Sequence, residues 1–190
     1  MSETRVATSV EELIGQLDEA VEDDCTDGKC SKVKEILERM FRAQHDFLDE
    51  SLLVPLPDTY ARRLLHRDPA GRYSVVVMVW GPGQETPLHD HAGKWCVECV
   101  YKGRVKVDSY RMESEDEDGL ARLTKVTTVH AGVGAAGALI PPFEYHVLAN
   151  DTDGPSVTVH VYAEELTCCN KFVPEGDGYR KEKCELCYSP

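Results

Sequence analysis

Apolar residues recur at helical spacing near the start of the chain. In residues 9–21 they lie three and four positions apart, and Ser9 with Glu12 has the form of a capping box, so we predict a helix that begins near Ser9. A second apolar set with the same period predicts another helix over residues 32–48. Gly28 is expected to separate the two helices. The first quarter of the chain is therefore predicted to be helical.

After Pro55 and Pro57 the pattern changes to short runs rich in β-branched and aromatic residues, separated by glycine and proline turns. The predicted strands are Tyr73–Trp80, Thr86–His91, Trp95–Tyr101, Arg104–Tyr110, Leu123–His130, Glu144–Leu148 and Ser156–Tyr162. Many short strands without intervening helices favour an antiparallel sandwich or barrel with the helices packed outside. We expect one domain, with a helical segment over 1–54, a barrel core over 55–172 and a C-terminal tail over 173–190.

The predicted strand that contains TVHVY has two different faces. Because alternate side chains leave opposite faces of a strand, Thr158, His160 and Tyr162 share one face while valines occupy the other. Such a polar and aromatic face is unremarkable if water covers it. If it lines the lumen of a barrel, the same residues are functional groups in an enclosed site.

His89 and His91 lie two positions apart in a predicted strand, just after a turn. Both imidazoles leave the same face, so they can reach one metal ion while Asp90 points away. A third ligand is then expected elsewhere in the chain. His146, which follows another turn on a second extended segment, is the best candidate.

Composition and charge narrow the class of protein. The chain has 190 residues, of which 42% are hydrophobic, and this is ample for one domain with a full core. The net charge of −13 argues against a nucleic-acid partner, which would need clusters of lysine and arginine. The sequence has no apolar run long enough to span a bilayer and no signal-peptide pattern, so we expect no membrane partner and a cytoplasmic location.

Eight cysteines are many for a cytoplasmic protein. Two closely spaced sets are Cys25 with Cys30 and Cys184 with Cys187. The second set is a CxxC motif, which suits half of a zinc site or a redox pair. Because no second half has suitable spacing, we favour a free or reversibly oxidised pair, and the sequence leaves the role of both sets open.

The histidines also fall within known motifs. The residues spaced as in the first cupin motif are Gly83, His89, His91 and Gly103. His146 and Asn150 resemble the second motif. Cupins usually carry a glutamate ligand four or five residues after the HxH pair, where this chain has Cys96. Cys96 together with the TVHVY run from Thr158 resembles the cysteine dioxygenase family of thiol dioxygenases, over residues 60–172.

This resemblance implies a mainly β fold, a cupin jelly-roll barrel, that holds one non-haem Fe(II). The implied metal ligands are His89, His91 and His146. The resemblance further implies a thioether crosslink between Cys96 and Tyr162. It also implies a hydrogen bond from His160 to the Tyr162 hydroxyl, and it places Thr158 behind the metal ligands in the position of the usual serine.

The substrate-binding residues implied by the resemblance are less closely defined. Tyr60 and Arg62 resemble the family's YxR element, whose arginine pairs with the substrate carboxylate. An ungapped count from Trp80 selects Arg63 instead, so both arginines stay open. Trp80 would pack beside the iron pocket, and Cys168 would lie near its mouth.

The expected function is therefore oxidation of L-cysteine by O₂ to cysteine sulfinate, with a small thiol and O₂ as partners and the protein a monomer. A dioxygenase of 3-mercaptopropionate, or of another small carboxylated thiol, is the nearest alternative. A cupin enzyme with another metal would normally need the missing glutamate. A metal-binding cupin without enzymatic activity is a further alternative.

Overall fold

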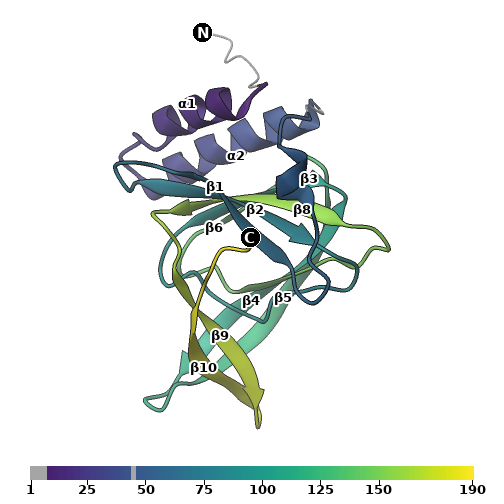
Figure 1. Ribbon diagram of the computed structural model, residues 1–190. Coiled ribbons are helices and arrows are strands. Elements are labelled where there is room, and N and C mark those ends of the chain that lie inside the picture. The colour runs from purple at the N-terminus through teal and green to yellow at the C-terminus, as the bar shows by residue number, and fades with distance from the viewer. Residues whose placement is uncertain (1–7, 44–45) are drawn as a thin grey trace.

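Two five-stranded β-sheets form the body of the molecule, and the N-terminal helices lie over the first sheet (Figure 1). The structure is a computed structural model that describes residues 8–43 and 46–190. All of the strand pairs are antiparallel. The mainly β fold with the helices outside confirms the predicted class.

The first sheet has the order β1-β2-β8-β3-β6, and the second has the order β7-β4-β5-β10-β9. The strands of the first sheet are β1 (Ala61–Arg67), β2 (Tyr73–Trp80), β8 (Ser156–Ala163), β3 (Cys96–Lys102) and β6 (Ala136–Leu139). Those of the second are β7 (His146–Ala149), β4 (Arg104–Glu115), β5 (Leu120–Gly132), β10 (Gly178–Glu185) and β9 (Cys168–Glu175).

Helix α1 (Val10–Ala20) begins where the capping box predicts, because the Ser9 hydroxyl accepts a hydrogen bond from the Glu12 amide at 3.2 Å. A short 3₁₀ helix, η1 (Glu50–Leu53), leads toward β1. Within residues 8–43 and 46–190, no helix is both long enough and apolar enough to cross a membrane.

The predicted break at Gly28 is wrong, since helix α2 (Thr26–Arg42) begins two residues before it. The Cys25 thiol caps the helix and accepts a hydrogen bond from the Gly28 amide at 3.2 Å. A side chain at position 28 would meet the Asp23 carboxyl, with a Cβ only 2.4 Å from its nearest oxygen, so this close approach favours glycine. The helix ends at Arg42 rather than at position 48, and positions 44–45 lie outside the described residues.

The first sheet is buried on both faces, because α2 packs on β3 and β6 while the second sheet covers the opposite side. All residues of β2 are buried in consequence. In β8, Val157, Val159 and Val161 join the core under the helices, whereas Tyr162 joins the core between the sheets. Alternation therefore turns Thr158 and His160 inward with Tyr162, so the TVHVY face is enclosed rather than solvated.

Two sequence predictions differ from the structure. The segment 86–91 is not a regular strand, because it pairs only through isolated bridges, among them those of His89 with His146 and Lys171. Residues 173–190 are not a tail, since β10 pairs along β9 and the chain then returns to β1. There the Ser189 amide donates to the Arg62 carbonyl at 2.7 Å. The charged composition of β10 concealed this strand from the hydrophobic pattern.

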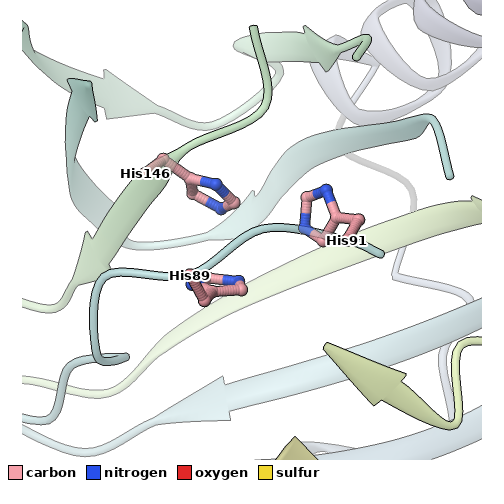
Figure 2. Close-up of side chains that lie close together, drawn as sticks. All are labelled: His89, His91 and His146. Carbon is pink, nitrogen blue, oxygen red and sulfur yellow. The ribbon is translucent and has the colours of Figure 1, made fainter. Parts of the chain in front are cut away.

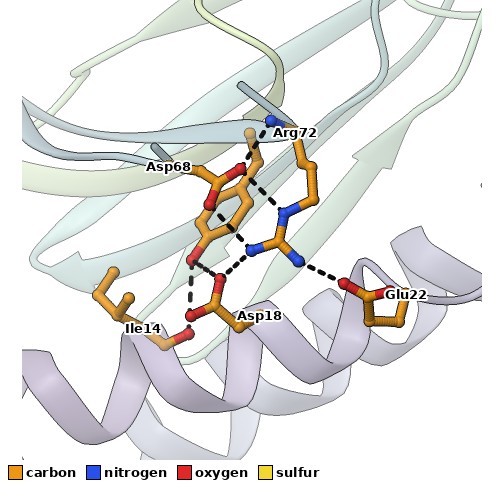
Figure 3. Close-up of polar contacts among 6 residues, drawn as sticks. Ile14, Asp18, Glu22, Asp68 and Arg72 are labelled. Carbon is orange, nitrogen blue, oxygen red and sulfur yellow. Dashed lines mark hydrogen bonds and ion pairs between the residues drawn. The ribbon is translucent and has the colours of Figure 1, made fainter. Parts of the chain in front are cut away.

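Arg72 joins helix α1 to the turn between β1 and β2 (Figure 3). Its guanidinium donates to both oxygens of Asp68, each at 2.9 Å, and it also contacts Asp18 and Glu22 of the N-terminal helical region. Asp68 is 4% exposed. Hydrogen bonding from the Arg72 side chain holds the pKa of Asp68 well below its usual value. The network fastens the helical layer to the first sheet.

We predict that Asp68→Asn lowers the melting temperature at pH 7 by about 5 °C, the scale of losing one buried charge-assisted contact. Because the folded-state pKa of Asp68 is depressed, its contribution is present above about pH 4 and is lost as the pH falls toward that lower pKa. Thermal unfolding at pH 7 and at about pH 3 measures both effects. The exposed Asp58→Asn variant is the control, and an equal loss in both variants contradicts the prediction.

Candidate metal centre

Two segments far apart in sequence bring the histidines together. The backbones of His89 and His146 form a bridge, with each amide donating to the other's carbonyl at 3.2 Å. Asn150 fixes the turn that precedes His89, since its side-chain amide donates to the carbonyls of Trp80 and Gly81. The two cupin-like motifs of the sequence are therefore hydrogen-bonded to each other in the structure.

The rings of His89, His91 and His146 converge on one point (Figure 2). Their candidate ligand nitrogens all lie within 4.8 Å of one another. The ring centroids are 4.4 Å apart for His89 and His146, 5.1 Å for His91 and His146, and 5.4 Å for His89 and His91. The structure thus brings together all three residues that the sequence singled out as metal ligands.

Hydrogen bonds orient two of the three rings. His89 Nδ1 lies 3.0 Å from the Pro87 carbonyl, and His146 Nδ1 lies 2.8 Å from the Glu144 carbonyl. Since a carbonyl oxygen only accepts, each Nδ1 carries the proton and each Nε2 keeps a lone pair for a metal. The same arrangement is typical of metal-binding histidines.

The electrostatics of the cluster suit a cation. Burial lowers the pKa of His89 and lowers the pKa values of His91 and His146 well below the usual range, and the neighbouring imidazoles add to the effect on the latter two. All three rings are therefore neutral and able to bind metal near pH 7. Three convergent imidazoles with free ring nitrogens fit a divalent transition metal well.

Cys96 and Tyr162 lie directly opposite each other in the pairing of β3 with β8. Both side chains are buried and face the space between the sheets. Burial raises the pKa values of the Cys96 thiol and the Tyr162 hydroxyl well above their usual ranges. The Tyr162 ring lies 5.6 Å from the ring of His91, beside the metal ligands.

The hydrogen bond expected from His160 to the Tyr162 hydroxyl is absent among the described residues. The two rings stack instead, with centroids 5.8 Å apart, and the Tyr162 hydroxyl lies 4.0 Å from Met78 Sδ. His160 Nε2 contacts the Thr158 hydroxyl at 2.7 Å, which in turn accepts from Trp80 Nε1 at 2.9 Å. Thr158 and Tyr162 are both two positions from His160 and share its face, and the hydrogen bond of the His160 ring goes to Thr158.

The two candidate arginines point to opposite faces of β1. Arg63 donates to the carbonyls of Leu52, Val54 and Pro190, so its guanidinium is occupied by backbone acceptors. Arg62 lines the pocket that contains His89 and His146. This side chain is 5% exposed, donates through Nη2 to the Leu166 carbonyl at 2.8 Å, and has no hydrogen-bond partner at Nη1.

The pocket is small, with a volume of about 50 Å³. Tyr60 and Trp80 line it beside Arg62, with their rings 4.7 Å apart. Cys168 is not among its lining residues, because alternation along β9 turns Cys169 inward in its place. Cys169 faces Cys184 across β9 and β10, and both thiols line the pocket.

Glu98 is a site residue that the sequence analysis missed. It follows Cys96 by two positions on β3 and so shares its inward face. One carboxylate oxygen lies 3.8 Å from His146 Nε2 and 3.6 Å from His160 Nδ1. Burial raises the pKa of Glu98 to about 7. The available signal was that Glu98 lies two positions after Cys96 and so shares its face of the strand. The cupin motif indicates only the glutamate-ligand position, which Cys96 occupies.

Two antiparallel sheets around a cluster of three histidines from an HxH pair and a distant segment define a metal-binding cupin. A family model described as cysteine dioxygenase type I matches residues 1–174. The chain belongs to this family of cupin dioxygenases.

Several solved structures are also similar. A protein from Thermus thermophilus has 21% identity and a TM-score of 0.46, covering 63% of this chain and 97% of that chain. A protein with a double-stranded β-helix domain from Klebsiella pneumoniae has 19% identity and a TM-score of 0.46, covering 63% and 90%. A sugar phosphate isomerase from Silicibacter pomeroyi has 16% identity and a TM-score of 0.45, covering 66% and 77%.

We predict that His146→Gln weakens binding of Co(II) by more than about 100-fold, because loss of a ligand exceeds the 10–100-fold effect typical of an outer partner. Chelator competition measures the affinity. His130→Gln is the matched control, since His130 is half exposed on β5 and pairs with Asp151 away from the trio. Wild-type affinity in His146→Gln would exclude this histidine as a ligand.

Proposed function

We propose that the protein is a thiol dioxygenase that uses Fe(II) at His89, His91 and His146 to oxidise L-cysteine to cysteine sulfinate. The observation that supports this most directly is the buried Arg62, which has an unpaired Nη1 and lines the same small pocket as His89 and His146. The metal, which would bind the substrate sulfur, and the Arg62 guanidinium, which would bind the substrate carboxylate, then face the same cavity.

The metal's contribution follows from its ligands. None of the three imidazole ligands carries a negative charge, so bound iron would favour a thiolate over a neutral ligand and would act as the redox partner of O₂. The overall reaction balances without another reductant. Sulfur gives up four electrons, O₂ accepts four, and both oxygen atoms end on sulfur.

Arg62 supplies the substrate's second anchor. Its guanidinium can give a carboxylate two parallel hydrogen bonds, and in the described residues no acidic side chain forms an ion pair with it. Its position is fixed by the Leu166 carbonyl and by the Tyr188 ring, 4.7 Å from the guanidinium carbon. Two anchored ends orient a small thiol and hold its sulfur near the histidines.

Tyr162 is a hydrogen-bond donor beside the metal ligands, with its ring 5.6 Å from that of His91. Burial keeps its hydroxyl protonated, because its pKa lies well above the usual range. The guanidinium of Arg62 lies 5.9 Å from the centre of the Tyr162 ring. We therefore assign Tyr162 to donate a hydrogen bond to the reacting oxygen atoms, while the packed interior excludes bulk water.

We further propose that Cys96 and Tyr162 become joined by a thioether bond. A bond between Cys96 Sγ and the ring carbon next to the hydroxyl forms with loss of the thiol hydrogen and one ring hydrogen. Two electrons and two protons pass to O₂, which gives hydrogen peroxide. Their opposite positions on paired strands support the bond, which would fix the ring of Tyr162.

Oxygen uptake by the iron-loaded protein tests the function. We expect uptake with L-cysteine to exceed that with cysteamine, which lacks the carboxylate, and with mercaptosuccinate, which carries a second carboxylate into a small pocket. It should also exceed uptake with 3-mercaptopropionate, which has the same spacing of thiol and carboxylate but lacks the amine as a further metal ligand. Faster uptake with 3-mercaptopropionate would instead select the alternative substrate. No uptake with any thiol would exclude a thiol dioxygenase and leave a metal-binding cupin without this activity.

The same assay tests Arg62 with a matched pair of variants. Arg62→Lys keeps the charge but loses the two-pronged donor, so kcat/KM for cysteine is expected to fall about 10–100-fold. The value for cysteamine, which has no carboxylate, should change little. Arg63→Lys, at the adjacent position on the other face, should resemble wild type, and the reverse ranking would transfer the role to Arg63.

We predict that Cys96→Ser abolishes the thioether, whereas Cys99→Ser, on the same strand but facing the helices, retains it. Denaturing gels and intact mass measure it after aerobic turnover with iron and thiol. Wild type and Cys99→Ser should lose two hydrogen atoms from the intact mass. An unchanged mass in wild type would contradict the proposed bond.

A further inference from the structure

Glu98 is a buried carboxylate without a matching cation. It is 7% exposed, and across the sheet it faces His160 on one side and Gly137 on the other. Its Oε2 has no hydrogen-bond partner. In the part of the chain that the structure describes, no lysine or arginine forms an ion pair with it.

The surroundings of Glu98 offer little compensation for its charge. The carboxylate lines a second cavity, of about 320 Å³, whose wall includes β3 and β6 and which shares Leu148 with the Arg62 pocket. Most of the cavity wall is apolar, and small residues at 135–138 leave the space beside Glu98 unfilled. His130, the basic residue in the wall, is paired with Asp151 at 3.1 Å. An isolated charge in such a place is costly.

A divalent metal ion held by His89, His91 and His146 would supply the positive charge that Glu98 lacks. The Oε2 atom lies 3.8 Å from His146 Nε2, the nitrogen that keeps its lone pair for the metal. Glu98 is not part of the cluster whose ligand atoms lie within 4.8 Å of one another. It is therefore placed beside the metal-binding atoms but outside the set of ligands.

We propose that Glu98 is the charge-compensating carboxylate of the metal centre: its side chain, held beside His146 and His160, balances part of the metal's positive charge without ligating it. With only the three neutral histidines around it, a divalent metal ion would place two positive charges in a dry interior. With Glu98 ionised, the net charge of the loaded site is +1, which strengthens the hold on the metal. Glu98 is thus a positioning and electrostatic residue rather than a catalytic one.

This inference rests on the proposed metal site but not on the identity of the thiol. The test therefore uses metal binding, with Co(II) in air and Fe(II) under anaerobic conditions, and no turnover. Glu98→Gln keeps the shape of the side chain and removes its charge. We expect it to weaken binding of either ion about 10–100-fold by chelator competition, and to change the visible spectrum of bound Co(II).

Four further measurements separate charge from packing. Without metal, Glu98→Gln should melt at the wild-type temperature or higher, because the variant lacks an uncompensated buried charge. Addition of metal should raise the melting temperature of Glu98→Gln less than that of wild type, because the variant binds metal more weakly. Glu98→Asp, which keeps the charge, should bind metal more tightly than Glu98→Gln. Asp68→Asn removes a different buried carboxylate, one that pairs with Arg72 rather than with the histidines, and should bind metal as wild type does.

Wild-type metal affinity in Glu98→Gln would overturn the inference. So would a lower melting temperature of the metal-free variant combined with an unchanged gain on adding metal, since that result indicates a packing role. If thiol oxidation fails while these binding results hold, the proposed reaction is wrong but the role of Glu98 stands.

Discussion

Burial of both faces of the first sheet is the constraint on which the site depends. The helices require one face of β2, β3 and β8 to be apolar, and alternation then sends every second side chain into the space between the sheets. The antiparallel register of β3 and β8 sets Cys96 opposite Tyr162 and Glu98 opposite His160. A shift of one residue in the register of β8 would turn its valines into the space between the sheets. The alternation of apolar and polar side chains therefore determines both helix packing and the geometry of the site.

The interior polar groups divide into two kinds. Arg63, Arg72 and Asn150 have their hydrogen-bonding capacity occupied by protein acceptors, and they hold segments of the fold together. Arg62 and Glu98 each keep a buried atom without a partner, and the free ring nitrogens of the histidine trio face one another. Unsatisfied buried groups are costly in a folded protein, so Arg62 and Glu98 beside the histidine trio indicate where ligands complete the structure.

The sequence was sufficient for features that local rules determine. The cap at Ser9, the two faces of β8 and the convergence of the histidines all follow from spacing and alternation. It was insufficient where tertiary contacts decide. The choice between Arg62 and Arg63 depends on the exact start of β1, and the inward thiol is Cys169 because β10 pairs with β9. Glu98 looked like an ordinary strand charge, since its missing partner is visible only in three dimensions.

The return of the chain to β1 has a consequence for how the two parts of the site can vary. Ser189 hydrogen-bonds to the backbone of Arg62 across 127 positions, Tyr188 stacks on its guanidinium, and Cys184 and Leu186 line the same pocket. None of these residues belongs to the histidine trio. Substitutions in the C-terminal segment can therefore reshape the surroundings of the arginine while the three imidazole rings keep their places.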